Sequence, residues 1–205
     1  MRFAIVCMAL ASMAAGARPA EKLRNQKLVS AEIALQPGET VPVEGRPAVT
    51  VYFDAGSLEF TPRGGRPRKT SVARGDTVFS PAEAGEIRNT GASGLHFVRT
   101  EFLTDGSSEM WGAAGLSPNY KLLIENRYAR VYDIKIPAGA KEPQHTHKAR
   151  VVVCLSGAVL KHLMPDGREE PSTLQSGEVA WRAGATHIGQ NLGATDLWVI
   201  AIEPK

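Results

Sequence analysis

Cysteine is scarce in this sequence. The 205 residues include only two, Cys7 and Cys154. We expect Cys7 to leave with an N-terminal signal, and the single cysteine that remains cannot form an internal disulfide. Cys154 lies in the apolar run 151–155, so we interpret it as a small buried apolar side chain.

The sequence also lacks a large excess of either charge. The chain has 24 Lys and Arg against 21 Asp and Glu, which gives a formal net charge of +3. The densest basic stretch, residues 63–69, has the Gly and Pro content of a turn with a solvated tip. It has no interleaved aromatic residues and no recognition helix, so we expect no nucleic-acid partner.

Apolar runs are too short to span a bilayer as a stable anchor. The longest candidate, residues 3–11, follows Arg2 and precedes the small-residue site at 15–17. We interpret residues 1–17 as a cleavable signal peptide, with an uncleaved helix as the alternative. Cleavage would give a periplasmic or secreted protein with no membrane association.

Amphipathic helix patterns are absent after residue 20. The chain instead has short strand-like runs separated by Gly, Pro and Asp turns, as in residues 130–136, where Ile134 and Ile136 fall on one face. Residues 151–155 are continuously apolar, which predicts a strand buried on both faces. The pattern predicts an all-β protein.

The chain also contains an internal repeat. Offsets of 101 residues, and of 102 after a one-residue insertion, place like residues on like residues. The matched pairs are Asn25 with Asn126, Gly38 with Gly139, Val51 with Val152, Gly56 with Gly157, Leu58 with Val159, Gly75 with Gly177, and Asn89 with Asn191. Glycines repeat in this way where the backbone requires a positive φ. Chance similarity between two β-rich halves is the alternative; we favour duplication, with copies at 20–103 and 117–205 and a linker at 104–116.

Three of the five histidines cluster in the second copy. His145 and His147 are two residues apart, so a strand would point both to one side, and His187 on a later strand could close the site. Three neutral imidazoles would hold a divalent transition metal and leave open positions. The alternative is a polar pocket filled by three histidines. We interpret His162 and His96, which have no motif partner, as ordinary hairpin or surface residues.

The spacing of these residues resembles the two motifs of the cupin superfamily. Gly139, the His145–His147 pair and Gly157 resemble the first motif, and the second is matched by Gly177, Gly184, His187 and Asn191. The resemblance implies a secreted bicupin of two tandem jelly-roll β-barrels. It says little of function, because the family contains enzymes, storage proteins and sugar-binding domains.

Two features depart from the family pattern. The family usually has a glutamate ligand after the second histidine, but its place falls on Arg150 or Val151, depending on the direction of counting. In the first copy, the same offsets place Glu44, Arg46 and Gly85 against the three histidines. We therefore expect a three-histidine site in the second barrel only, and a structural role for the first.

Two functional hypotheses remain open, and the sequence does not decide whether the protein is an enzyme. The first is a metal-dependent cupin, of dioxygenase or isomerase type, with Fe, Mn, Zn, Ni or Cu and a small oxygenated or carboxylated ligand. Arg150 would bind a carboxylate if its side chain turns inward, and Gln144 and Gln190 flank the histidines. The second is a non-catalytic module for a small ligand or sugar. A structural homo-oligomeric scaffold is a further alternative.

Overall fold

The fold is seen in a computed structural model that describes residues 16–112 and 115–205. These residues form strands and turns and no helix, so none of them lies in a helix long and apolar enough to cross a membrane. The expected signal peptide, residues 1–17, lies almost wholly outside the described residues. The all-β prediction is confirmed.

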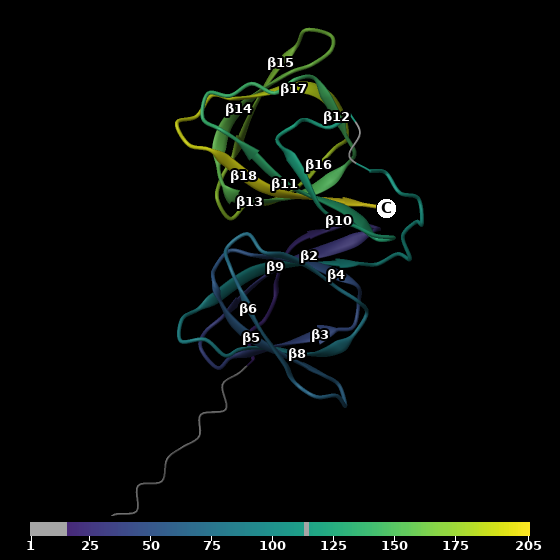
Figure 1. The fold of residues 1–205 in the computed structure, drawn as a ribbon, viewed down its shortest axis with the longest axis vertical. Coiled ribbons are helices and arrows are strands. Elements are labelled where there is room, and N and C mark those ends of the chain that lie inside the picture. The colour runs from purple at the N-terminus through teal and green to yellow at the C-terminus, as the bar shows by residue number, and fades with distance from the viewer. Residues whose placement is uncertain (1–15, 113–114) are drawn as a thin grey trace, which may run out of the picture.

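Each half of the chain forms one barrel, and each barrel is built from a five-stranded and a four-stranded antiparallel sheet (Figure 1). In the first barrel the sheets have the orders β1-β2-β9-β4-β7 and β3-β8-β5-β6. Its strands are β1 (Ala20–Arg24), β2 (Leu28–Leu35), β3 (Thr40–Glu44), β4 (Ala48–Tyr52), β5 (Gly56–Pro62), β6 (Arg68–Val72), β7 (Thr77–Ser80), β8 (Ala84–Asn89) and β9 (Leu95–Phe102).

The second barrel repeats this topology strand for strand, with the orders β10-β11-β18-β13-β16 and β12-β17-β14-β15. Its strands are β10 (Tyr120–Glu125), β11 (Ala129–Ile136), β12 (His145–His147), β13 (Arg150–Ser156), β14 (Ala158–Leu163), β15 (Glu169–Leu174), β16 (Val179–Arg182), β17 (Ala185–Asn191) and β18 (Leu197–Pro204). The predicted pair of tandem jelly-roll barrels is therefore confirmed.

Details of backbone geometry repeat as well. Asn25 and Asn126 each accept two backbone N–H bonds through the side-chain oxygen, at the turn before the second strand of their barrel. Gly38 and Gly139 both have a positive φ, of 83° and 73°. A turn that requires this conformation explains why glycine recurs at the same place.

The strand register shows that the one-residue insertion lies before Val43, whereas the sequence comparison placed it after Leu58. His145 pairs with His187, whereas Val43 pairs with Gly85, so the counterpart of His145 is Val43 rather than Glu44. The offset is already 102 in this strand. Gly45, rather than Arg46, therefore corresponds to His147. Apolar strands match equally well when shifted by one residue, so only the pairing reveals the error.

The same shift corrects the matches in the next strands. Val51 pairs with Val98, and Val153 pairs with Ile200, so Val51 corresponds to Val153 rather than Val152. Leu58 pairs with Asn89 as Leu160 pairs with Asn191, so Leu58 corresponds to Leu160 rather than to the exposed Val159. Gly56, opposite Val72, corresponds to Ala158, opposite Leu174, rather than to Gly157.

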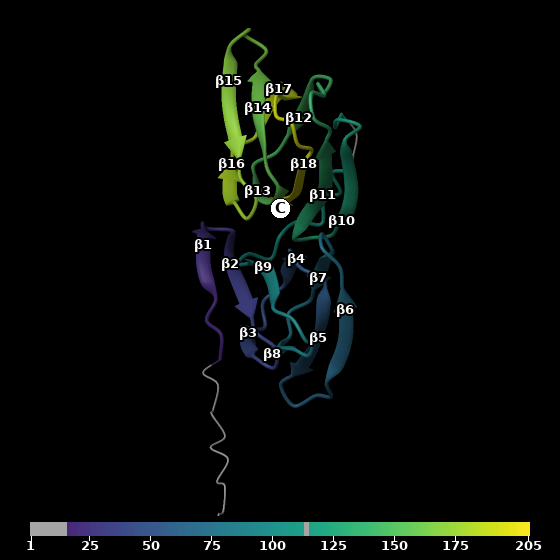
Figure 2. The same ribbon diagram turned by 90° about the vertical axis from the view of Figure 1, so that its left-hand side faces the viewer.

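The two barrels are joined through the faces of their five-stranded sheets, as Figures 1 and 2 show. Side chains from both sheets form one buried apolar cluster, which we call the seam. From the first barrel it includes Val49, Val51 and Val98, and from the second Val151, Val153 and Ile200. The predicted strand 151–155 is buried on both faces because odd-numbered residues enter the seam while Val152 and Cys154 enter the barrel core.

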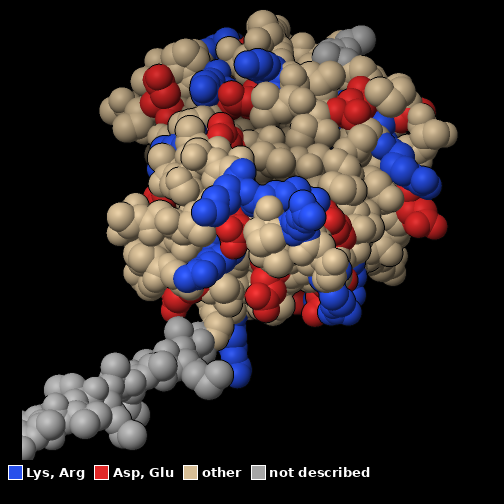
Figure 3. Space-filling model, turned by 60° about the horizontal axis from the view of Figure 1, so that its bottom comes forward, with Lys and Arg blue, Asp and Glu red and all other residues tan. Residues whose placement is uncertain are grey.

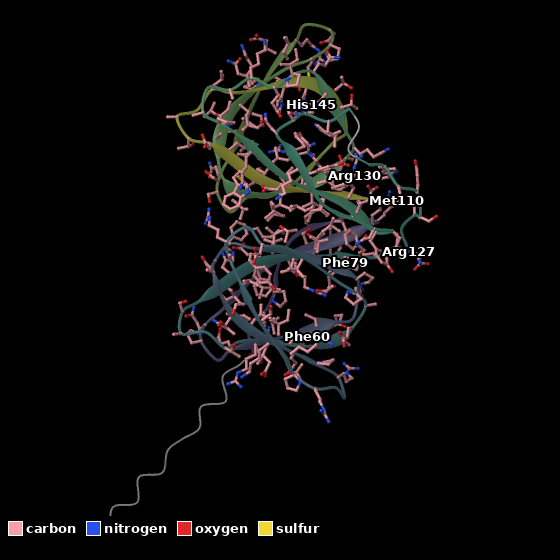
Figure 4. All side chains as sticks on the ribbon, in the orientation of Figure 1. Phe60, Phe79, Met110, Arg127, Arg130 and His145 are labelled. Atoms are coloured by element: carbon pink, nitrogen blue, oxygen red, sulfur yellow. The ribbon has the colours of Figure 1, made fainter. Side chains whose placement is uncertain are left out.

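The linker lies against the second barrel. The backbone N–H groups of Trp111 and Gly112 donate to the Glu125 carboxylate, and the Trp111 ring packs beside Arg130, Lys148 and Lys205. Met110, by contrast, is 65% exposed and projects from the side of the molecule in Figure 4.

Charges of both signs share the outer end of the first barrel (Figure 3). Within the basic stretch 63–69, Arg68 forms an ion pair with Glu83 and lies over the Phe60 ring. Residues 63–67 of the stretch form the turn between β5 and β6, as predicted, and Arg68 begins β6.

Candidate metal and ligand site in the C-terminal barrel

The three motif histidines meet inside the second barrel (His145 is labelled in Figure 4). β12 pairs antiparallel with β17, which sets His145 directly opposite His187, and His147 points to the same side as His145. The ring centroids of His187 lie 4.9 Å from His145 and 5.0 Å from His147, and the other two rings are 6.0 Å apart. All three side chains are buried.

Backbone carbonyl groups fix the proton positions on two of the rings. Nδ1 of His145 lies 3.0 Å from the Pro143 carbonyl, and Nδ1 of His147 lies 3.2 Å from the Lys148 carbonyl. A carbonyl only accepts, so in a neutral ring Nδ1 carries the hydrogen and Nε2 has a free lone pair. Nε2 of His145 accepts from the Tyr120 hydroxyl at 3.2 Å, whereas Nε2 of His147 is buried without a partner.

Burial keeps the imidazoles of His147 and His187 neutral. It lowers the pKa of His147 to about 3, with the nearby Arg150 charge as the second cause. It also lowers the pKa of His187 to about 3, and there the second cause is His162. Neutral imidazoles at physiological pH are ready to bind a cation or accept a proton.

A cavity of about 310 Å³ opens beside these rings. Its polar wall includes His147, His187, Arg150, His162 and Tyr120. Its apolar wall is formed by Ile134, Ile136, Val152, Leu160, Leu174, Leu197 and Val199.

His162 lies in this cavity and is not an ordinary hairpin residue. Its ring stacks on His187 with centroids 4.3 Å apart and planes 8° apart. It lies on β14 directly opposite Gly189 of β17, two residues from His187. The sequence pattern missed it because the neighbouring strand, rather than a motif, brings it to the site. His96 also has partners, stacking on Phe53 and bonding to Glu32.

Tyr120 and Glu142 are further cavity residues that motif spacing did not indicate. Tyr120 comes from β10, and burial raises the pKa of its hydroxyl. The Glu142 carboxylate accepts a bond from the Asn119 amide at 3.3 Å.

Solved structures with this architecture are known, although no protein-family model and no curated protein matches the chain. A cupin 2 conserved barrel domain protein from Leptotrichia buccalis matches with a TM-score of 0.61 and 15% identity, over 96% of this chain and 92% of its own. AerE from Microcystis aeruginosa matches with a TM-score of 0.60 and 14% identity, over 93% and 97%. A variant of Bacillus subtilis oxalate decarboxylase matches with a TM-score of 0.57 and 18% identity, over 87% and 69%.

The chain has the fold of the cupin superfamily. A second structure of Bacillus subtilis oxalate decarboxylase, a protein described as having Mn(II) centres, matches with a TM-score of 0.55 and 17% identity. The cupin fold is therefore compatible with a divalent metal.

The three histidines of this barrel fit a divalent metal in kind and in spacing. With metal–nitrogen bonds of about 2.1 Å, three imidazoles around one ion have ring centroids about 5 Å apart, close to the separations found here. As they stand, no three His, Cys, Asp or Glu side chains among the described residues form a complete metal site. The hydroxyl of Tyr120 occupies Nε2 of His145 and would have to move aside.

Of the two candidate positions for the missing glutamate, strand direction selects Arg150. Arg150 points into the cavity, whereas Val151 points into the seam. Gln144 is exposed, Gln190 is half-buried on β17, and neither lines the cavity. The first barrel has a cavity of about 290 Å³ lined by Tyr52 and Arg99 among others, but no histidine lines it.

Proposed function

We propose that the C-terminal barrel binds a divalent transition metal through His145, His147 and His187 and presents it to a small oxygenated or carboxylated molecule. The observation that supports this most directly is the buried Nε2 of His147, which has no partner although it lies among two other imidazoles. A buried nitrogen lone pair without a partner costs free energy, which a metal would recover.

When bound, the metal would supply Lewis-acid or redox chemistry. The chain's own residues would orient the metal ligands, exclude water and bind the substrate. The carbonyl groups of Pro143 and Lys148 hold the two Nδ1 hydrogens and so direct both Nε2 atoms inward. The apolar wall excludes water, and Arg150 presents a positive charge to an anionic ligand. The reaction type is left unassigned, because no cavity residue has the geometry of a specific general base.

Metal content tests the proposal. We expect purified protein reconstituted separately with Fe, Mn, Zn, Ni or Cu to retain one equivalent of at least one of them after desalting. His147→Ala should lower retention at least tenfold, with an unchanged circular dichroism spectrum. His96→Ala, in the first barrel, is the matched control and should retain the metal. A wild-type protein that retains none of the five metals would overturn the proposal.

A metal-free binding module is the second candidate. The bond from Tyr120 to Nε2 of His145 favours it, because it gives this imidazole a partner without a metal. In that case ligand binding would be insensitive to chelators, and His147→Ala would change affinity without any change in metal content.

We also propose that the protein is exported after cleavage at residue 17 and that it is a homo-oligomer. N-terminal sequencing of protein from the native host should begin at Arg18, and light scattering should give a mass above 22.0 kDa. An intact N-terminus would exclude cleavage, and a monomeric mass would exclude oligomerisation.

A further inference from the structure

We propose that Arg150 makes this cavity a binding site for a small carboxylic acid with an apolar body. The inference deepens the proposed function by naming the ligand class. It concerns the same cavity, but it depends on the guanidinium group and not on the metal.

The position of Arg150 directs its side chain inward. It begins β13, where Arg150 pairs with Arg182, and alternation along the strand turns Arg150, Val152 and Cys154 to the barrel interior. The equivalent residue of the first barrel is Ala48, because Ala48 pairs with Glu101 in the corresponding register. The arginine is therefore particular to the barrel that has the histidines.

The guanidinium group lacks the partners that a buried charge requires. Arg150 is only 9% exposed, and its Nε and Nη1 atoms are buried without hydrogen-bond partners. Two carboxylates line the same cavity, but Glu142 accepts from Asn119 and Glu170 pairs with Arg168. Arg150 has no ion pair within the part of the chain that the structure describes. Its contact with Tyr120, whose ring centre is 5.7 Å away and whose hydroxyl it approaches, is with a neutral group.

Guanidinium N–H donors are the part of arginine that binds a carboxylate. A buried cation with two unused donors is costly, so an anion that accepts from either of them recovers part of that cost. The remainder of the cavity is largely aliphatic, formed by residues such as Ile134, Leu160 and Val199. A carboxylate on an apolar body therefore matches both walls, whereas a sugar would leave the aliphatic wall without apolar contacts.

Thermal unfolding of metal-free protein in EDTA tests the assignment. The probes are propionate and benzoate, compared with propionamide and benzamide, which have the same shape but no charge. At about 100 times the dissociation constant we expect either carboxylate to raise the Tm by about 5 to 10 °C. The amides should raise it by less than a fifth of that shift.

Variants test whether the Tm shift depends on Arg150 or is a general effect of anions. Arg150→Gln should abolish the carboxylate shift, and its own Tm without ligand should equal or exceed the wild-type value, because an unpaired buried charge has been removed. Arg150→Lys should weaken binding at least tenfold, because an ammonium lacks the forked donors. Arg127→Gln, at an exposed arginine of the same barrel that does not line the cavity, is the control and should keep the full shift.

Four results would overturn the assignment: equal stabilisation by amides, equal stabilisation by phosphate or sulfate, an undiminished shift in Arg150→Gln, or no shift with either carboxylate. If Arg150→Gln does not fold, the carboxylate–amide comparison on wild-type protein decides. Metal retention without a carboxylate shift would refute this inference alone. A carboxylate shift in a protein that retains no metal would refute only the metal proposal.

Discussion

Glu203 connects three parts of the C-terminal barrel through one buried side chain. Its carboxylate is fully buried; Oε2 accepts from Nε of Arg130 at 2.8 Å and Oε1 accepts from the backbone N–H of Lys148 at 2.9 Å. The carbonyl of Lys148 in turn accepts from Nδ1 of His147. Glu203 thus anchors the backbone of Lys148, whose carbonyl orients a candidate metal ligand.

We expect Glu203→Gln to lower the free energy of unfolding by about 3 to 5 kcal/mol, because it leaves the buried Arg130 without its counter-charge. Urea denaturation followed by circular dichroism measures the loss. The control is Asp166→Asn, which removes an exposed pair with Arg168 and should leave the free energy of unfolding nearly unchanged. Equal losses for the two variants would contradict the structural role of Glu203.

The three motif histidines of the site could be predicted from the sequence, whereas His162 and Tyr120 could not. Side chains two apart on a strand share a side, so His145 and His147 follow from spacing alone. His162 and Tyr120 reach the cavity from β14 and β10, which lie in different sheets and face the same interior only when the barrel forms. Counting residues could not decide whether Arg150 or Val151 takes the place of the usual glutamate. The structure decides it, because Arg150 faces the cavity and Val151 faces the seam.

At the scale of elements, one buried asparagine in each barrel makes the same three hydrogen bonds between a strand and a turn. Asn89 donates to the carbonyl groups of Leu35 and Ser93, and its side-chain oxygen accepts from the N–H of Gly91. Asn191 makes the three corresponding bonds. Each asparagine is fully buried and links the end of one strand to the turn before another.

We expect Asn89→Ala and Asn191→Ala each to lower the free energy of unfolding by about 1 to 3 kcal/mol, because buried carbonyl groups lose their donor. Each variant serves as the control for the other in urea denaturation. Similar losses would show that the repeat preserves energetics as well as geometry. A loss below about 0.5 kcal/mol at either site would show that these bonds do not stabilise the fold.

At the scale of the whole molecule, the seam makes two barrels into one cooperative structure. The first barrel covers the sheet face of the second. Arg74 donates to the carbonyl of Leu155, and Gly75 approaches the Trp198 ring so closely that an added Cβ would lie 2.2 Å from it. We therefore expect one unfolding transition for both barrels.

Alanine variants of Gly75 and Gly177 can separate the cost of the backbone conformation from the cost of disturbing the seam. Both have a φ of 86°, but an added Cβ at Gly177 meets no atom within 4 Å. Each alanine variant should lose about 1 to 2 kcal/mol from the left-handed backbone, and Gly75→Ala should lose about 1 to 3 kcal/mol more from overlap with Trp198.

Urea denaturation followed by tryptophan fluorescence measures both losses, because all three tryptophans lie in residues 111–198. If the barrels share a core, Gly75→Ala in the first barrel should also lower the urea midpoint of the second barrel, which these tryptophans report. Equal losses for the two variants, or separate transitions for the two barrels, would contradict a shared core.

The sequence by itself determined the fold class, the duplication and the histidine trio, because strand alternation, turn glycines and the spacing of polar residues are local properties of the chain. The tertiary structure decided where the insertion falls, which side of β13 faces the cavity, and which residues from distant strands complete the site. These depend on strand register, and a shift of one residue leaves an apolar pattern almost unchanged while it reverses the direction of every side chain.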